Sequence, residues 1–210
     1  DQRLSVSGKV DRVDGWLHDG RLYLRVVDYK TGKKSFDLSD LRYGLGIQML
    51  LYLFTLTRDA SGRFTGAQPA GVLYLLADQP PQEAGRDDPA APAVRLDGLV
   101  QDSPAVYDAM DADETGLYLP FSFQNGKPGG RQKKKLADMP KFGRIEKHLD
   151  SLVTDMASQL YAGRIEAEPL CTSARDSCAF CDFGDICCHE KGLGERALQT
   201  PDDPFGVLVP

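Results

Sequence analysis

The first thirty residues alternate between hydrophobic and polar positions in a way that predicts two strands. The alternation runs through residues 4–11 (LSVSGKVD) and again through residues 21–30 (RLYLRVVDYK). Alternate side chains of a strand project from the same face, so each run has one buried face. The Asp19-Gly20 pair between the runs tolerates the positive φ angles of a tight hairpin turn. The pattern therefore predicts a hairpin that brings Asp11 alongside Asp28.

Charged residues continue the buried face of the second run. Leu22, Leu24 and Val26 mark that face, and Asp28 and Lys30 follow on it. A strand that breaks its own pattern at its end often does so for a functional site. Two nearby carboxylates repel each other unless a base or a divalent cation neutralises them, so Lys30 together with Mg²⁺ (or Mn²⁺) would balance the two acids. The alternative is an amphipathic hairpin whose charged residues are solvated.

Further elements follow from local composition and periodicity. We expect a helix over residues 41–58, with Gln48 and Tyr52 one turn apart on one face. Gly8 indicates a close backbone approach or a bulge in the first strand, and Asp14 is either a supporting acid or the start of the turn. The remaining predictions are a buried strand over 70–77, a loop over 78–93, a helix over 104–110, a strand over 117–123 and a long helix from Met139 to a stop at Gly163, with a core-facing apolar stripe that includes Met156 and Leu160.

Length and composition indicate one globular domain. The chain has 210 residues, 41% hydrophobic and 27% charged, and a net charge of −6. Its longest apolar run, residues 49–56, is too short to cross a bilayer, and no signal peptide opens it, so we expect a cytoplasmic protein. The first predicted strand starts only a few residues after Asp1, which suggests a piece of a longer protein.

The net negative charge gives no general attraction to nucleic acid. Binding of DNA would depend on metal ions, a partner protein or local basic segments. Two such segments are Lys33-Lys34 and the loop of residues 124–135, whose positive charges are Lys127, Arg131, Lys133, Lys134 and Lys135. Each is either a contact for the DNA backbone or a solvated loop. Histidines are not expected to form a catalytic metal site, because His18 lies in the predicted turn, His148 in the long helix and His189 after the cysteines.

All five cysteines fall within one short segment, residues 171–188, with the spacing C-x6-C-x2-C-x5-C-C. Clustering of this kind indicates a metal site more than disulfides in a cytoplasmic protein. Zinc would accept Cys171, Cys178, Cys181 and Cys187, and a [4Fe-4S] cluster needs four such thiolates. We therefore divide the chain into a core (1–170), a cysteine-rich segment (171–190) and a tail (191–210).

Three motifs in order carry a resemblance to a known family. They are Gly8-x-Val10-Asp11, then Asp28-Tyr29-Lys30-Thr31-Gly32, then Gly44-x3-Gln48-x3-Tyr52. The arrangement resembles the RecB-type branch of the PD-(D/E)xK nuclease superfamily, and especially the nuclease domains of helicase-nuclease B subunits. The resemblance implies an α/β fold with a restriction-endonuclease-like core, in which helices flank a central mixed sheet and a cysteine-rich tail follows.

The resemblance also implies roles for individual residues. Asp11, Asp28 and the backbone carbonyl of Tyr29 would bind Mg²⁺, and Lys30 would orient or deprotonate the attacking water. Gln48 and Tyr52 would hold the scissile phosphate or a metal-bound water. Three thiolates, those of Cys178, Cys181 and Cys187, would ligate an iron-sulfur cluster whose fourth ligand lies upstream, unless Cys171 or Cys188 substitutes.

The implied activity is DNA exonuclease action in double-strand break repair, with DNA and a helicase-nuclease A subunit as partners. One alternative is a free-standing CRISPR-associated single-strand DNA exonuclease with the same motifs. Another is a non-catalytic DNA-binding scaffold stabilised by zinc. Metal analysis would decide between zinc and iron, and a Mg²⁺ or Mn²⁺ titration at Asp11 and Asp28 would separate an enzyme from a scaffold.

Overall fold

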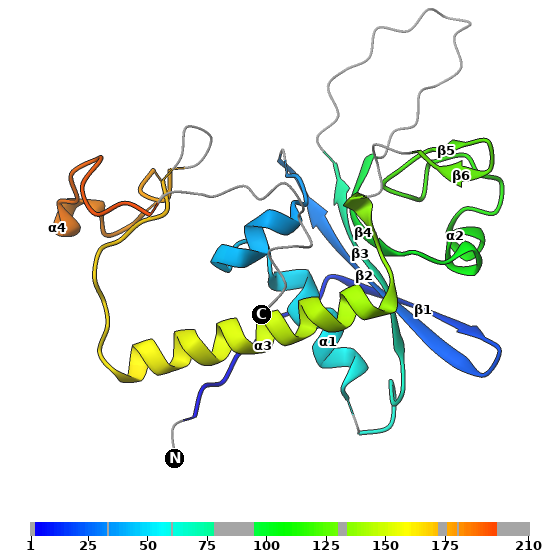
Figure 1. The fold of residues 1–210 in the computed structure, drawn as a ribbon, viewed down its shortest axis with the longest axis horizontal. Coiled ribbons are helices and arrows are strands. Elements are labelled where there is room, and N and C mark those ends of the chain that lie inside the picture. Colours follow the sequence, from blue (N-terminus) through cyan, green and yellow to red (C-terminus); the bar gives the residue numbers. More distant parts are fainter. Residues whose placement is uncertain are drawn as a thin grey trace, which may run out of the picture.

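A five-stranded mixed sheet forms the centre of the molecule (Figure 1). The computed structural model describes residues 3–32, 34–59, 61–77, 95–129, 134–171, 176–179 and 181–196. The strand order is β1-β2-β3-β4-β7. The strands are β1 (Arg12–His18), β2 (Arg21–Lys30), β3 (Gln68–Leu76), β4 (Arg95–Gln101) and β7 (Leu136–Ala137). Two pairs are parallel, β2 with β3 and β4 with β7, and the other two are antiparallel.

The hairpin of β1 and β2 is confirmed, with its turn at Asp19-Gly20. Both turn residues have positive φ, 47° and 74°, which matches the twist of the flanking strands. The predicted strand over residues 4–11 is wrong, because β1 begins only at Arg12. Main-chain pairing stops at Arg12 opposite Val27. Beyond that point the side chain of Asp11 accepts the Tyr29 N–H at 3.1 Å, so a side chain takes the place of a strand partner.

Residues 3–10 run over the helical layer instead of extending the sheet. A Cβ placed on Gly8 would lie 2.6 Å from Cε1 of Tyr52, which confirms the close backbone approach predicted at this glycine. At the start of the segment, the Arg3 N–H donates to the Tyr161 hydroxyl at 2.8 Å. The N-terminal stretch is therefore held against two helices.

Helices cover both faces of the sheet. One face packs against η1 (Leu38–Tyr43), α1 (Gln48–Thr57) and the first half of α3 (Met139–Tyr161). The other packs against α2 (Pro104–Met110) and against the small hairpin of β5 (Phe123–Gln124) and β6 (Lys127–Pro128). The predicted strand 70–77 is confirmed as β3, buried along nearly its whole length, and the predicted helix 104–110 is confirmed as α2.

Three other predictions need correction. The helix expected over 41–58 is divided, because Gly44 and Gly46 adopt positive φ between η1 and α1. The strand expected over 117–123 is reduced to the two residues of β5. The long helix is confirmed as α3, but its apolar stripe is core only in part: Phe142 and Ile145 are buried, whereas Leu160 is 63% exposed. The predicted loop 78–93 lies outside the described residues.

The cysteine-rich segment forms a separate small unit after α3. Residues 164–168 are exposed and without regular structure, and isolated bridges then join Leu170 to Arg196 and Cys171 to Asp176. The short helix α4 (Gly184–Cys187) lies away from the sheet (Figure 1). Of the helices in the described part of the chain, none combines the length and the apolarity that a bilayer span requires.

Candidate active site

Asp28 is a buried acid at the C-terminal end of β2. It is only 6% exposed, and Lys30 Nζ lies 2.5 Å from its Oδ2 atom. Among the described residues Oδ2 accepts no hydrogen bond, and the Lys30 ammonium balances its charge. Buried carboxylate oxygens are normally satisfied. A buried acid held by a lysine alone, at the end of a strand, indicates a functional site.

Asp11 lies beside Asp28 at the same end of the sheet. Arg12 pairs with Val27 across the hairpin, so the preceding residue is opposite Asp28. The hydrogen bond from the Tyr29 N–H holds the Asp11 side chain there. The structure thus brings together Asp11, Asp28, Tyr29 and Lys30, as the hairpin predicts.

The two acids fit a divalent cation. Two carboxylates and a backbone carbonyl are hard oxygen donors of the kind that Mg²⁺ and Mn²⁺ prefer. Oδ2 of Asp28 accepts no hydrogen bond among the described residues, and a single lysine leaves the pair of acids with residual negative charge. The ligand roles of Asp11, Asp28 and the Tyr29 carbonyl remain predictions.

A buried tyrosine lies next to this site in the sheet. Tyr74 of β3 pairs with Asp28 on one side and with Asp97 of β4 on the other. Burial, with the negative charges of Asp28, Asp40 and Asp97, raises the pKa of Tyr74 to about 12. Lys30 Nζ lies 5.8 Å from the ring centroid, a distance at which a cation is attracted to the ring face. The site therefore combines negative charge with a lysine placed over the face of a buried aromatic ring.

Gln48 and Tyr52 of α1 lie beside the segment that leads to Asp11. Gln48 is the first residue of α1, and its Nε2 donates to the Tyr52 hydroxyl at 3.0 Å. Tyr52 packs over Gly8, three residues before Asp11. In the described part of the chain neither side chain is hydrogen-bonded to Asp28 or Lys30. The pair is linked to these two residues only through the segment that carries Gly8 and Asp11. Their role toward phosphate or water remains a prediction.

Asp14 does not support the site. It lies on the opposite face of the sheet, where it forms ion pairs with Arg12 at 2.7 Å and Arg25 at 2.6 Å. Desolvation would raise the pKa of Asp14, but the hydrogen bonds from the two arginines hold it below its usual value. The arginine pairs identify Asp14 as a structural acid.

The histidines also lie in structural contacts. His18 stacks on Trp16 with centroids 4.4 Å apart, and His148 contacts the Leu41 carbonyl oxygen at 3.1 Å. Neither reaches the candidate site.

The basic segments are only partly available to DNA. Lys135 is half-buried and forms an ion pair with Asp97, so it is not a free contact for a phosphate backbone. Lys34 Nζ lies 5.9 Å from the Tyr74 ring centroid, beside the site. Lys134 is exposed. Lys33, Arg131 and Lys133 lie outside the described residues.

Sequence reasoning missed Asp97 and Tyr74, and it considered Lys135 only as a contact for DNA. Asp97 sits in the mostly apolar run RLDGLVQ, the same kind of break that singled out Asp28. The strand itself was missed because it directly follows the proline-rich stretch. Tyr74 is masked by its apolar neighbours in AGVLYLLA.

The cysteine-rich segment brings together one possible set of metal ligands among the described residues. Atoms of Cys171, Asp176 and Cys178 lie within 4.8 Å of one another. Although Cys178 is exposed, local desolvation and the nearby Cys171 and Asp176 raise the pKa of its thiol. Two thiols and a carboxylate fit zinc or iron. Asp176 was not predicted, and a shared metal for Cys178, Cys181 and Cys187 remains a prediction.

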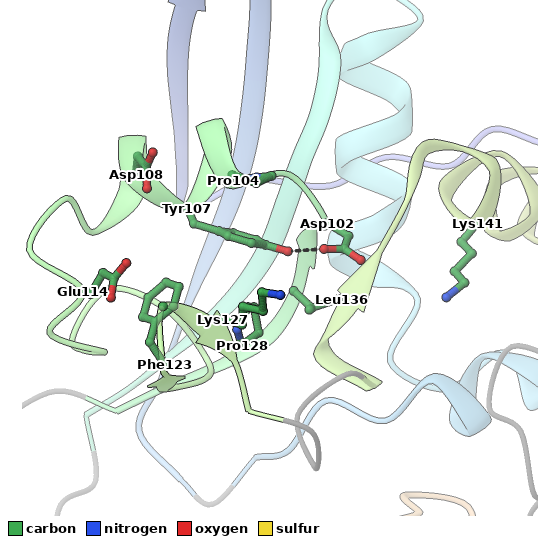
Figure 2. Close-up of a pocket in the computed structure, with 11 residues that line it drawn as sticks. Asp102, Pro104, Tyr107, Asp108, Glu114, Phe123, Lys127, Pro128, Leu136 and Lys141 are labelled. Atoms are coloured by element: carbon green, nitrogen blue, oxygen red, sulfur yellow. Dashed lines mark hydrogen bonds between the residues drawn. The ribbon is translucent and has the colours of Figure 1, made fainter.

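A separate cavity lies on the other face of the sheet (Figure 2). It has a volume of about 620 Å³, and α2, the small hairpin and the start of α3 line it. Inside it the Tyr107 hydroxyl donates to Asp102, and burial together with this bond raises the pKa of Tyr107. Acidic and basic side chains both line the cavity, so its charge favours no single class of ligand.

Comparison with known proteins agrees with this geometry. Residues 1–188 match the family described as the PD-(D/E)XK nuclease superfamily. The chain belongs to this superfamily, and its mixed sheet with flanking helices is the restriction-endonuclease-like core of that fold.

Its relatives include large bacterial proteins, each named as the B subunit of an ATP-dependent helicase/deoxyribonuclease. The protein of Thermoanaerobacter sp. (strain X514) is 30% identical over 201 residues, which cover 91% of this chain and 17% of that protein. That of Desulforudis audaxviator is 33% identical over 202 residues, covering 90% and 17%. That of Clostridium kluyveri is 28% identical over 215 residues, covering 96% and 19%. The chain thus spans less than a fifth of the length of these relatives.

Proposed function

We propose that this chain is the Mg²⁺-dependent DNA exonuclease domain of a helicase-nuclease. The observation that carries the proposal is the buried carboxylate of Asp28, ion-paired with Lys30 and next to Asp11. Membership of a nuclease superfamily supports it, as do relatives that are named as components of a deoxyribonuclease.

Each residue of the site has a distinct task in this proposal. Asp11, Asp28 and the carbonyl of Tyr29 hold the metal, which when bound activates water and neutralises charge on the scissile phosphate. Lys30 orients the attacking water or takes up its proton. Gln48 and Tyr52 fix the position of the phosphate, because their mutual hydrogen bond limits the orientations available to both.

The proposal extends to the setting of the domain. The relatives' names point to an ATP-dependent helicase-nuclease. We infer that the intact protein works with a helicase-nuclease A subunit on broken chromosomal DNA in the cytoplasm. The thiols of Cys178, Cys181 and Cys187, with an upstream cysteine or Cys171, would hold a [4Fe-4S] cluster there.

Replacement of the two acids tests the proposal. In the native full-length chain with its partner, Asp28→Asn and Asp11→Asn should each reduce Mg²⁺-dependent release of nucleotides from end-labelled DNA by more than about a hundredfold. A loss of about a hundredfold is the largest effect expected when a residue that only supports a metal ligand is replaced, so a greater loss indicates a direct ligand. DNA binding should persist. Asp19→Asn is the matched control, since it removes the same charge from an exposed turn where positive φ suits asparagine.

Retention of near-normal cleavage by Asp28→Asn would refute the assigned site. A wild-type complex that binds DNA without cleaving it, and that contains zinc, would instead favour the scaffold alternative. Single-stranded and duplex substrates, labelled at either end, separate the exonuclease of a helicase complex from a free-standing single-strand enzyme.

A further inference from the structure

A buried ion pair holds the main chain six residues after Lys30. Asp97 of β4 and Lys135, just before β7, pair with each other. The Phe36 N–H donates to Asp97 Oδ2 at 2.9 Å, and Lys135 Nζ donates to the Phe36 carbonyl at 3.1 Å. The ion pair of Asp97 and Lys135 thus binds both the N–H and the carbonyl oxygen of Phe36. We name Asp97, Lys135 and the peptide groups of Phe36 the Phe36 clamp.

The clamp removes two charged side chains from water, which costs free energy unless the two charges are paired. Asp97 is 8% exposed and Phe36 7%. Removing one partner of a buried pair leaves an uncompensated charge, whereas replacing both with apolar groups is often neutral. The clamp also joins three segments that are far apart in sequence, separated by 38, 61 and 99 residues. It fixes the chain that leaves β2 against the sheet.

Direct packing links the clamp to the candidate site. The Phe36 ring lies 6.4 Å from the Tyr74 ring, centroid to centroid. Tyr74 in turn carries Lys30 over its face at 5.8 Å. Asp28, Tyr74 and Asp97 are direct neighbours across β2, β3 and β4, and cross-strand neighbours share one face. A shift of Phe36 therefore moves the ring on which Lys30 rests.

We propose that Asp97 and Lys135 are positioning residues that hold Lys30 and the end of β2 in place through Phe36 and Tyr74. This inference rests on the proposed function of Lys30. Neither residue touches the substrate. Because small displacements of a reacting group are expensive in rate, loss of the clamp should lower turnover more than substrate binding.

The first measurement is independent of cleavage. In the full-length chain, Lys135→Met should speed amide hydrogen exchange at Phe36 and at Tyr29, each by about tenfold or more. Lys134→Met is the matched control, because Lys134 is the adjacent exposed lysine and loses the same charge. Unchanged exchange at Tyr29 in Lys135→Met would overturn the link between clamp and site.

The second measurement separates positioning from folding. At saturating Mg²⁺ and DNA, and well below its unfolding temperature, Lys135→Met should show kcat reduced by about tenfold or more, with KM for DNA unchanged. Lys135→Arg should recover part of kcat, because it keeps a charged donor. The double variant Asp97→Asn/Lys135→Met should regain thermal stability, since no unpaired charge is left, yet keep the low kcat.

Recovery of kcat together with stability in the double variant would overturn the proposal and leave the clamp a purely structural pair. The double variant also keeps the test decisive if Lys135→Met does not fold. Absence of Mg²⁺-dependent cleavage by the wild-type chain would instead refute the proposed function, and the exchange at Tyr29 would still decide whether the clamp holds the end of β2.

Discussion

At the scale of single residues, Tyr74 reports on the charge of the candidate site. Burial of its hydroxyl, followed by the negative charges of Asp28, Asp40 and Asp97, raises its pKa to about 12. The ordinary value is 10.0. The folded protein therefore retains this proton at pH values where the unfolded chain has lost it.

A pH dependence of stability follows from that shift. A folded-state pKa above the unfolded value contributes stability that is complete below about pH 10 and is lost as pH rises toward about 12. Relative to Tyr74→Phe, the wild-type chain should thus lose free energy of unfolding over this range, on the order of 1 kcal/mol after solvent screening. Urea unfolding from pH 9 to 12 measures the difference. Tyr118→Phe, at an exposed tyrosine, should show no such change, and a constant gap for Tyr74→Phe would contradict the buried environment.

At the scale of elements, sequence patterns predicted the strands whose signal lies within their own residues. Alternation predicted β2 and the hairpin turn, and continuous apolarity predicted β3, because both signals are local. The start of β1 depends on a contact between distant residues. The side chain of Asp11 accepts the Tyr29 N–H and ends the pairing of the two strands, and the alternation over residues 4–11 does not predict this contact. For the same reason Asp28 and Lys30 were found from their strand, whereas Asp97 and Lys135 meet only through long-range contacts.

The contact between the N-terminal stretch and α1 can be tested at Gly8. Gly8→Ala places a methyl group where the Tyr52 ring lies. Overpacking of this kind typically costs about 1–3 kcal/mol, and a displaced ring would also break the bond from Gln48. We expect reduced thermal stability and reduced nuclease activity. Gly143→Ala is the control, since it lies in α3 outside the site motifs and no atom lies within 4 Å of its added Cβ; equal behaviour of the two variants would show that residues 3–10 do not pack on α1.

At the scale of the whole molecule, charge is organised locally. The net charge of −6 gives no general attraction to DNA. The described lysines nearest the site already have partners within the protein: Lys30 pairs with Asp28, Lys135 pairs with Asp97, and Lys34 lies over the ring of Tyr74. Bound metal, a partner surface or the other basic residues must therefore supply the positive charge that DNA requires. Sequence composition predicted this deficit, and the folded chain shows that Lys135 of the basic loop is used in an internal ion pair.

The cysteine-rich segment should bind metal without holding the core together in the 210-residue chain. Cys171, Asp176 and Cys178 form their cluster in the segment that follows α3, whose helix α4 lies away from the sheet (Figure 1). Exposed residues 164–168 lead into this segment. The double variant Cys171→Ser/Cys178→Ser should lose most bound zinc or iron, measured by elemental analysis of protein purified without oxygen. Its core should unfold within about 0.5 kcal/mol of wild type, as for surface changes. Cys188→Ser is the control, because the Cys188 thiol contacts the Asp185 carbonyl instead of the cluster. A core that loses stability in parallel with the metal would show that the segment braces the nuclease fold.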